Sequence, residues 1–372
     1  MSHKHIPYLF IADCNAEVRS LAAVILRRNI SYTATDSQDL SNQANNANLW
    51  KRLSPDAQNV VKTELLKAMT GIKEKAVIHK VCNLIIEIQG TIYDENETIW
   101  QDLMSLLFTF VNSDIDLQVD AALQIFNGLF SYIMEHLVKF KGDLLTIFTK
   151  TLQHKSLDIN LASLQAISNF LQIAEGKETR DFADIVLLMA QVPLKAAQED
   201  DETVLEDALV EFNEIAEIEP KFFRKHFKTI FGMFQPLVAK NDYTNNTIRH
   251  QPIEWAVTVV ERIPNIVKKD IETLKVLLDL VFKLMIDIDE DIEESWMRPK
   301  EGFKVEEEEE EEDSVHFGKV QVDRLVSAIG EEVMLPLLSQ LVQATIQNDQ
   351  DWRYKNAGIM ALSQVGEYID DI

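Results

Sequence analysis

The sequence predicts an all-α protein that is built from repeated helix pairs. Apolar residues recur at the spacing of one helical face, for example Leu103, Leu106, Leu107, Phe110 and Val111. The alternation of apolar and polar residues that is typical of strands between glycine-rich turns is missing. The 372 residues include only 11 glycines and 9 prolines, which is few for a loop-rich β protein. These observations together favour helices along the whole chain.

Segments rich in small and aliphatic residues recur with the pattern expected of the second helix of a pair. They begin at Asn15, Glu74, Asp116, Asp158, Glu202, Asn246, Lys319 and Asp351. The starts from Glu74 to Asn246 are 42, 42, 44 and 44 residues apart. A period of about 40–47 residues with two helices per unit is typical of HEAT arrays. The sequence therefore predicts a HEAT-repeat solenoid, a right-handed superhelix of about eight antiparallel helix pairs, stabilised by stacking of neighbouring pairs.

The two larger steps in this series each contain one insertion. The first holds an Asn- and Ser-rich stretch at residues 32–48, and the second holds a strongly acidic stretch. We therefore expect one HEAT-repeat array over residues 1–372. Its expected parts are N-terminal repeats at 1–286, an acidic loop at 287–317 between the helices of one repeat, and the following repeats at 318–372.

The acidic stretch, residues 287–313, carries fifteen carboxylates, three basic residues and a single tryptophan. Helical apolar faces precede it at residues 273–286 and follow it at 320–329. Connections of this length are usually functional or disordered, and this charge attracts Lys- and Arg-rich partners; the alternative is a solvated tract that keeps the array soluble. The predicted partner-binding residues are Asp287, Asp289, Glu290, Asp291, Glu293, Glu294, Trp296, Glu306, Glu307, Glu308, Glu309, Glu310, Glu311, Glu312 and Asp313.

The charge and composition of the chain exclude several classes of protein. A net charge of −25 repels nucleic acid and anionic membranes, so we expect no direct nucleic-acid partner. No run of about 18 apolar residues is present for a membrane span. The two cysteines, Cys14 and Cys82, are far apart and lack disulfide or metal spacing, which indicates a reducing, intracellular compartment.

Signatures of catalysis and of cofactor binding are missing from the sequence. It contains no phosphate-binding glycine-rich loop, no nucleophile elbow and no zinc-protease helix. Asp287, Asp289 and Asp291 could offer calcium ligands, but the glycine and the terminal glutamate of a calcium-binding loop are not in place. His79 and His250 are expected to be structural or solvated rather than general bases. The sequence thus predicts a protein that is not an enzyme and that holds no cofactor or metal.

The predicted second helices carry further carboxylates that could line an inner face of the array. Glu202, Glu206, Asp207 and Glu254 are candidates for binding basic cargo there, and the alternative for each is ordinary helix solubility. Trp255 lies partly on a helical core face, so we expect it to pack in the core.

The last helical segment, DWRYKNAGIMALSQVGEYI at residues 351–369, carries the main family likeness. Together with LAAVILRR at 21–28 and the tryptophan-containing acidic loop, it resembles the importin-β (karyopherin-β) superfamily, and in particular its importin-5-like members. The sequence departs from that pattern by placing its all-glutamate tract after Trp296. By this resemblance the chain lacks the first repeat and the C-terminal half of such receptors, and it is expected to be an N-terminal-half fragment. The matching residues are Trp352, Tyr354, Lys355, Ala357, Ala361, Leu362, Val365, Gly366 and Glu367.

The resemblance implies a nuclear transport receptor that shuttles between cytoplasm and nucleus. Such receptors bind basic (NLS-type) protein cargo on the inner face and release it when Ran-GTP binds. They also bind FG-repeat nucleoporins between outer helices, which here would be segments such as residues 182–191 and 222–235. The N-terminal repeats and the acidic loop are the family's Ran-facing elements, and a monomer is expected.

A second function class fits the same array. A HEAT-repeat scaffold of a multiprotein assembly, of the phosphatase type or another, would share the periodicity without any transport role. GTP-selective binding to Ran separates the two functions, because a scaffold lacks it.

Overall fold

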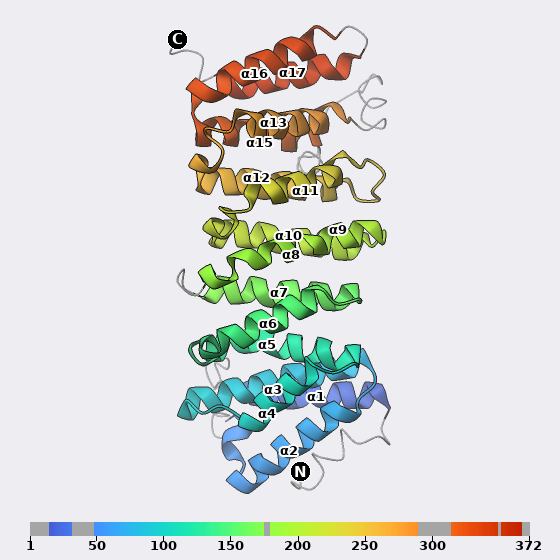
Figure 1. The fold of residues 1–372 in the computed structure, drawn as a ribbon. Coiled ribbons are helices and arrows are strands. Elements are labelled where there is room, and N and C mark those ends of the chain that lie inside the picture. Colours follow the sequence, from blue (N-terminus) through green and yellow to red (C-terminus); the bar gives the residue numbers. More distant parts are fainter. Residues whose placement is uncertain (1–14, 32–47, 175–178, 289–313, 349–350, 367–372) are drawn as a thin grey trace, which may run out of the picture. The chain divides into compact units, whose positions relative to one another are not determined.

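The structure, a computed structural model, describes residues 15–31, 48–174, 179–288, 314–348 and 351–366. Every regular element in these ranges is helical, which confirms the predicted all-α class. The chain divides into two compact units, Met1–Glu178 and Thr179–Ile372. Each unit is a stack of helix pairs (Figure 1). The continuous array expected over residues 1–372 stays a prediction.

In the first unit, the second helices of the pairs pack against one another in chain order, α1 on α3, α3 on α5 and α5 on α7. The first helices α2, α4 and α6 each pack on the second helix that follows. The elements are α1 (Ala16–Ser31), η4 (Trp50–Arg52), α2 (Pro55–Gly71), α3 (Lys75–Asn96), α4 (Gln101–Phe110), α5 (Asp116–Leu137), η5 (Val138–Phe140), α6 (Lys141–Leu152) and α7 (Leu157–Ile173).

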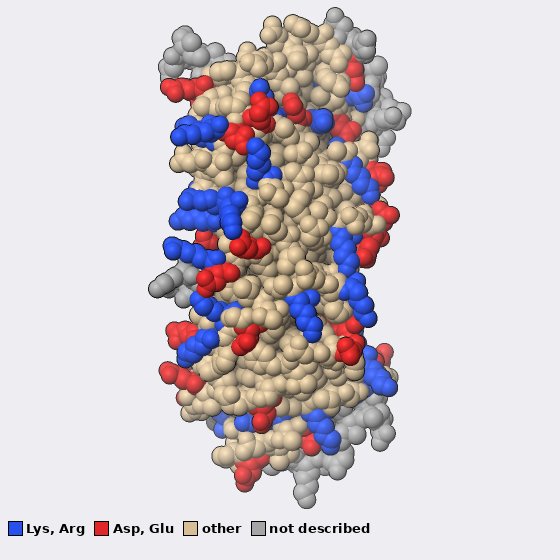
Figure 2. Space-filling view, viewed as in Figure 1, with Lys and Arg blue, Asp and Glu red and all other residues tan. Residues whose placement is uncertain are grey.

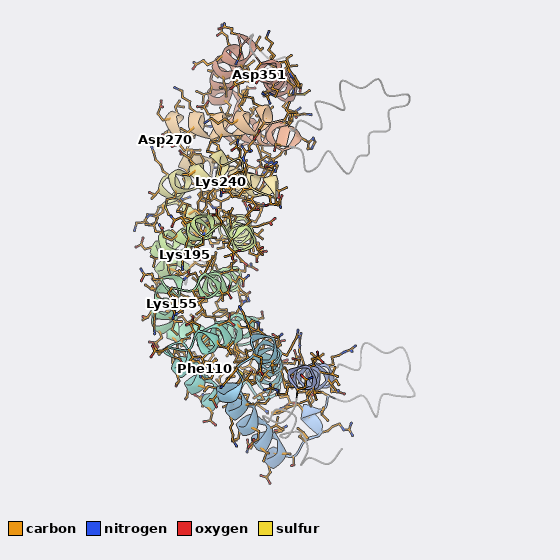
Figure 3. All side chains as sticks on the ribbon, turned by 90° about the vertical axis from the view of Figure 1, so that its right-hand side faces the viewer. Phe110, Lys155, Lys195, Lys240, Asp270 and Asp351 are labelled. Atoms are coloured by element: carbon orange, nitrogen blue, oxygen red, sulfur yellow. The ribbon has the colours of Figure 1, made fainter. Side chains whose placement is uncertain are left out.

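The second unit repeats this arrangement, with α10, α12, α15 and α17 as successive second helices. Figure 3 shows the helices nearly end-on, with Lys240 labelled in the turn between α11 and α12. The elements are η6 (Thr179–Ile185), α8 (Val186–Met189), α9 (Gln191–Gln198), α10 (Glu202–Ile218), η7 (Pro220–Phe223), α11 (Phe227–Ala239), η8 (Asn246–Arg249), α12 (His250–Arg262), η9 (Pro264–Ile266), α13 (Ile271–Ile286), α15 (Ser314–Ile329), α16 (Glu331–Ile346) and α17 (Trp352–Val365).

The predicted second helices are confirmed along the whole series. Each of the predicted segments contains one of the helices α1, α3, α5, α7, α10, α12, α15 and α17, or overlaps it over most of its length. Within the described residues, α1 is followed by seven complete helix pairs, in agreement with the expected number of about eight.

Polar side chains fix where several of these helices begin. Asp201 accepts a hydrogen bond from the backbone N–H of Val204 at the start of α10, at 3.1 Å. Asp351 caps α17 in the same manner through the N–H of Arg353, at 3.0 Å. Each carboxylate satisfies an N–H group that has no partner within its own helix, and its negative charge suits the positive end of the helix dipole.

Glycines allow the close approach of α3 and α5. A Cβ atom at Gly128 would lie 2.4 Å from Cδ1 of Ile86, and one at Gly90 would lie 2.6 Å from the ring of Tyr132. Each helix thus gives a small residue where the other places a large one. This complementary packing holds two successive repeats together.

An aromatic cluster forms part of the core of the second unit. Trp255 of α12 is fully buried, and its ring centroid lies 5.3 Å from that of Phe223, 5.3 Å from that of Phe227 and 5.4 Å from that of Phe234. These residues come from η7, α11 and α12, so the cluster links a helix pair to its connecting turn. The expected core role of Trp255 is confirmed.

Candidate partner-binding surface

The predicted acidic loop starts and ends at two helices that pack on each other. α13 ends at Ile286 and α15 begins at Ser314, and these helices form one pair. Of the residues proposed for partner binding in this loop, only Asp287 lies within the described part, and residues 289–313 lie outside it. Ser314 already belongs to α15, so the helix begins four residues before residue 318, where the loop was expected to give way to the following repeats.

Contacts with α12 and α13 explain this earlier start of α15. The rings of His250 and Phe317 are stacked, with centroids 4.3 Å apart and planes at 5°. Ser314 Oγ lies 2.9 Å from Nε2 of His250. Gly318 packs so tightly that a Cβ atom there would lie 2.2 Å from Cγ of Met285. These tertiary contacts stabilise the first turn of α15, and apolar periodicity alone could not reveal them.

Both ends of the acidic segment are held by consecutive residues at the start of α12. Arg249 is buried, and its Nη1 donates to the carboxylate of Asp287, while its Nε donates to the carbonyl of Val238 at 2.9 Å. His250 holds the other end through Ser314. The acidic segment therefore leaves and re-enters the array beside the N-terminus of α12.

The protonation state of His250 follows from its burial. Burial lowers the pKa of His250 to about 4, and the positive charge of Arg249 acts in the same direction. The imidazole is consequently neutral near pH 7. It acts as a structural contact, as the sequence suggested, rather than as a cation that balances the acidic segment.

The buried neutral His250 predicts a defined loss of stability in acid. The unfolded chain protonates this residue at an ordinary pKa of 6.5, whereas the folded chain does so only at about 4. Its contribution is complete above pH 6.5 and is lost as pH falls through this window, because the unfolded state then binds more protons. The free energy of unfolding, measured with urea, should fall between pH 7 and pH 4.5, and H250Q should make this fall smaller by on the order of 2 kcal/mol. The same fall in H250Q and in the wild type would contradict this role of His250.

The predicted inner-face carboxylates have different surroundings. Asp207 is exposed, while Glu202 accepts hydrogen bonds from the backbone N–H of Thr244 at 3.0 Å, and Glu206 accepts one from Asn245 at 3.3 Å. The last two carboxylates therefore hold the turn of the next repeat. Both side chains remain half-exposed at the surface.

Glu254 instead belongs to an ion-pair network between α12 and α15. Arg324 Nη1 donates to both oxygens of Glu254, at 2.7 and 2.8 Å, and Nη2 donates to Glu261 at 2.6 Å. Burial alone would lower the pKa of Arg324, but the hydrogen bonds and negative charges of the two glutamates outweigh it and raise that pKa above its usual value. Both carboxylate oxygens of Glu254 are thus occupied within the chain.

Amide pairs between successive second helices were not anticipated from the sequence. In the first unit, Gln124 donates to Asn83 at 3.0 Å and Asn169 donates to Asn127 at 2.9 Å. In the second unit, Asn213 donates to Gln251 at 2.7 Å. The residues of each pair are 41, 42 or 38 positions apart, which is close to the repeat period. This recurrence of amides at matching repeat positions is the signal that could have found them.

The described residues lack two kinds of feature, a membrane-spanning helix and a metal-binding cluster. None of the described helices has the length and apolar character needed to span a bilayer. In the same residues, no cluster of three or more His, Cys, Asp or Glu side chains could hold a metal ion. Of the three aspartates weighed as calcium ligands, Asp289 and Asp291 lie outside the described part.

The fold and these surfaces define the class of protein: it is built from repeated helix pairs, and one pair carries an acidic insertion. A family model described as "IPO5-like, TPR repeats" matches residues 73–233, and one described as "Importin repeat" matches residues 241–336. The chain belongs to the importin-β superfamily. The family resemblance seen in the sequence is thereby confirmed.

Individual relatives are distant, and the chain covers only part of them. It is 20% identical to the probable importin-5 homolog of Dictyostelium discoideum over 341 residues, which is 91% of this chain and 31% of that protein. It is 21% identical to importin-4 of Mus musculus over 380 residues, which is 98% of this chain and 32% of that protein. The chain thus spans about a third of the length of these relatives.

Solved structures of Kap121p share the fold. Kap121p bound to the extreme C-terminus of the protein phosphatase Cdc14p matches with a TM-score of 0.81 at 17% identity, covering 100% of this chain and 34% of Kap121p. Kap121p bound to Nup53p matches with a TM-score of 0.79 at 18% identity, with the same coverage. Kap121p bound to RanGTP matches with a TM-score of 0.74 at 18% identity, covering 100% and 36%.

Proposed function

We propose that this chain is part of a nuclear transport receptor that binds basic protein cargo and releases it when Ran-GTP binds. The observation that carries the proposal is the match of two importin family models to residues 73–233 and 241–336. The names of the similar Kap121p structures support it, because they include complexes with RanGTP and with protein partners. The chain itself would act by binding, without catalysis, and its receptor would move between cytoplasm and nucleus.

The second helices of the second unit offer suitable groups for an extended basic segment. Gln251, of the amide pair in this unit, carries an N–H₂ group that can donate to a peptide backbone. The surface carboxylates Glu202, Glu206 and Asp207 attract lysine and arginine side chains. Backbone recognition by amides and charge recognition by carboxylates would together favour NLS-type cargo.

The acidic segment is proposed to bind Ran or basic cargo. Its charge makes it a strong electrostatic attractor for either partner. If both partners compete for it, each lowers the affinity of the other by the same factor, as release requires. Trp296, the single tryptophan of the segment, is proposed to act as an anchor. FG-repeat nucleoporins are proposed to bind elsewhere, between the first helices.

The glutamate tract gives a direct test of this charge-based mechanism. Glu306–Asp313 should be replaced by an equal number of glutamine and asparagine residues, which keeps the length of the segment. We expect the affinity for a fluorescent Lys- and Arg-rich peptide to fall about tenfold at low salt, and the salt dependence to weaken. Fluorescence anisotropy at several salt concentrations measures both. Unchanged affinity for the peptide and for Ran-GTP would reduce the tract to a solubility element.

A further inference from the structure

A basic edge lies where the second helices of the second unit end. Figure 2 shows Lys and Arg side chains gathered on the left-hand side, beside α8 to α12. The four residues that define it, Lys221, Arg224, Lys268 and Lys269, come from the turns that follow α10 and α12, and all are exposed. In a chain with a net charge of −25, such a concentration of cations is unusual.

Ion pairs hold these two turns side by side. Arg262 at the end of α12 donates to the carboxylate of Glu217 near the end of α10. Lys228 at the start of α11 lies 2.8 Å from the carboxylate of Asp270, which precedes α13. The turns of residues 217–228 and 262–270 therefore form one connected surface.

Three carboxylates on this edge, those of Glu217, Asp184 and Asp270, are already paired with cations, whereas Glu219 has no ion pair among the described residues. Asp184 accepts from Lys225 at 2.6 Å and lies 2.9 Å from Nε2 of His226. The hydrogen bond from Lys225 and the contact with His226 hold the pKa of Asp184 below its usual value. Lys228 similarly lowers the pKa of Asp270. The four defining cations make no ion pair with any carboxylate that the structure describes.

Exposed apolar side chains adjoin these cations. Ile218, the last residue of α10, is 52% exposed, and Ile271, the first residue of α13, is 36% exposed. Ile218 precedes Lys221 by three residues, and Ile271 follows Lys269 by two. The edge therefore combines free positive charge with apolar contact area.

We propose that this basic edge binds an acidic peptide segment of a partner protein, one that carries aliphatic side chains among its carboxylates. Free cations recognise the carboxylates, and the two isoleucines offer contacts for the aliphatic groups. A peptide can dock on the edge alone, whereas a nucleic-acid duplex would extend over the acidic remainder of the chain. This surface goes beyond the proposed cargo and Ran contacts. It lies at the end of α12, about 18 Å along the helix from Arg249 and His250, which hold the acidic segment.

Charge neutralisation with a matched control tests the proposal. The edge variant is K221Q/R224Q/K268Q/K269Q, and the control is R52Q/K73Q/K80Q/K139Q, which changes the same residue types at exposed positions of the first unit. The probe is a fluorescent twelve-residue peptide of repeated Glu-Glu-Leu, measured by anisotropy at about 50 mM salt, where surface charges are weakly screened. We expect at least a tenfold loss of affinity in the edge variant and less than a twofold change in the control. Circular dichroism should show the same helix content for both variants.

Each of the other outcomes overturns the proposal. An equal loss in both variants would show a general charge effect, and no loss in either would show that the edge is not the site. Tighter binding of a single-stranded oligonucleotide of equal charge would assign the edge to nucleic acid. A tenfold gain in peptide affinity after deletion of residues 306–313 would show that the chain's own glutamate tract occupies the edge.

Discussion

Replacing Trp255 with alanine is expected to lower the free energy of unfolding of the second unit by about 3–5 kcal/mol. The side chain is fully buried and is surrounded by Phe212, Phe223, Phe227 and Phe234. Truncation would remove its apolar contact area and leave a cavity that these rigid rings cannot fill. The loss of stability should therefore be close to the largest values observed for core substitutions.

Hydrogen exchange is the suitable measurement for W255A, because repeat arrays depart from two-state unfolding. Amide protection should fall in α10, α11 and α12, whose side chains form or adjoin the cluster. The matched control is W352A, because Trp352 is 43% exposed and should cost only about 1 kcal/mol. Equal protection in W255A and the wild type would show that the aromatic cluster does not stabilise these repeats.

Replacing Arg324 with methionine is expected to cost about 2 kcal/mol of stability and to loosen the contact between α12 and α15. The change would leave Glu254 and Glu261 close together without their shared cation. Breaking a fully buried pair typically costs 3–5 kcal/mol, and the value is lower here because Arg324 is 20% exposed and each glutamate 32%.

A rescue variant separates the ion pair from simple packing. In R324M/E254Q/E261Q no charge is left unpaired, so most of the lost stability should return. Urea unfolding combined with hydrogen exchange in α15 measures the effect. A triple variant that is no more stable than R324M would show that Arg324 acts through its aliphatic stem rather than its charge.

The sequence predicts the helices that every repeat packs in the same way. It does not predict contacts that occur only once, between residues far apart in the chain. Segment starts at Glu74, Asp116, Asp158 and Glu202 lie within one residue of the first residues of helices α3, α5, α7 and α10, because every repeat must bury the same apolar face. The start of α15 was placed too late, because it depends on the contacts of Ser314 and Phe317 with His250, which is 64 residues from Ser314 in the chain.

For the candidate site, too, composition could be predicted from the sequence and individual contacts could not. The acidic composition of residues 287–313 and their place between α13 and α15 could be read directly from the sequence. The role of Glu254 could not, because its partner Arg324 is 70 residues away and only the pairing of α12 with α15 brings them together. The amide pairs were missed because single Asn and Gln residues on amphipathic helices look like ordinary surface residues.

Binding to Ran tests most directly our proposal that this chain is part of a Ran-regulated nuclear transport receptor. The chain should be immobilised and exposed to Ran loaded with GTP or with GDP at physiological salt, with the glutamine-substituted tract variant measured in parallel. We expect binding to the GTP form that is at least tenfold tighter than to the GDP form, and weaker binding by the tract variant. Equal affinity for both forms, or binding to neither, would contradict a Ran-regulated transport role and favour a HEAT-repeat scaffold without one.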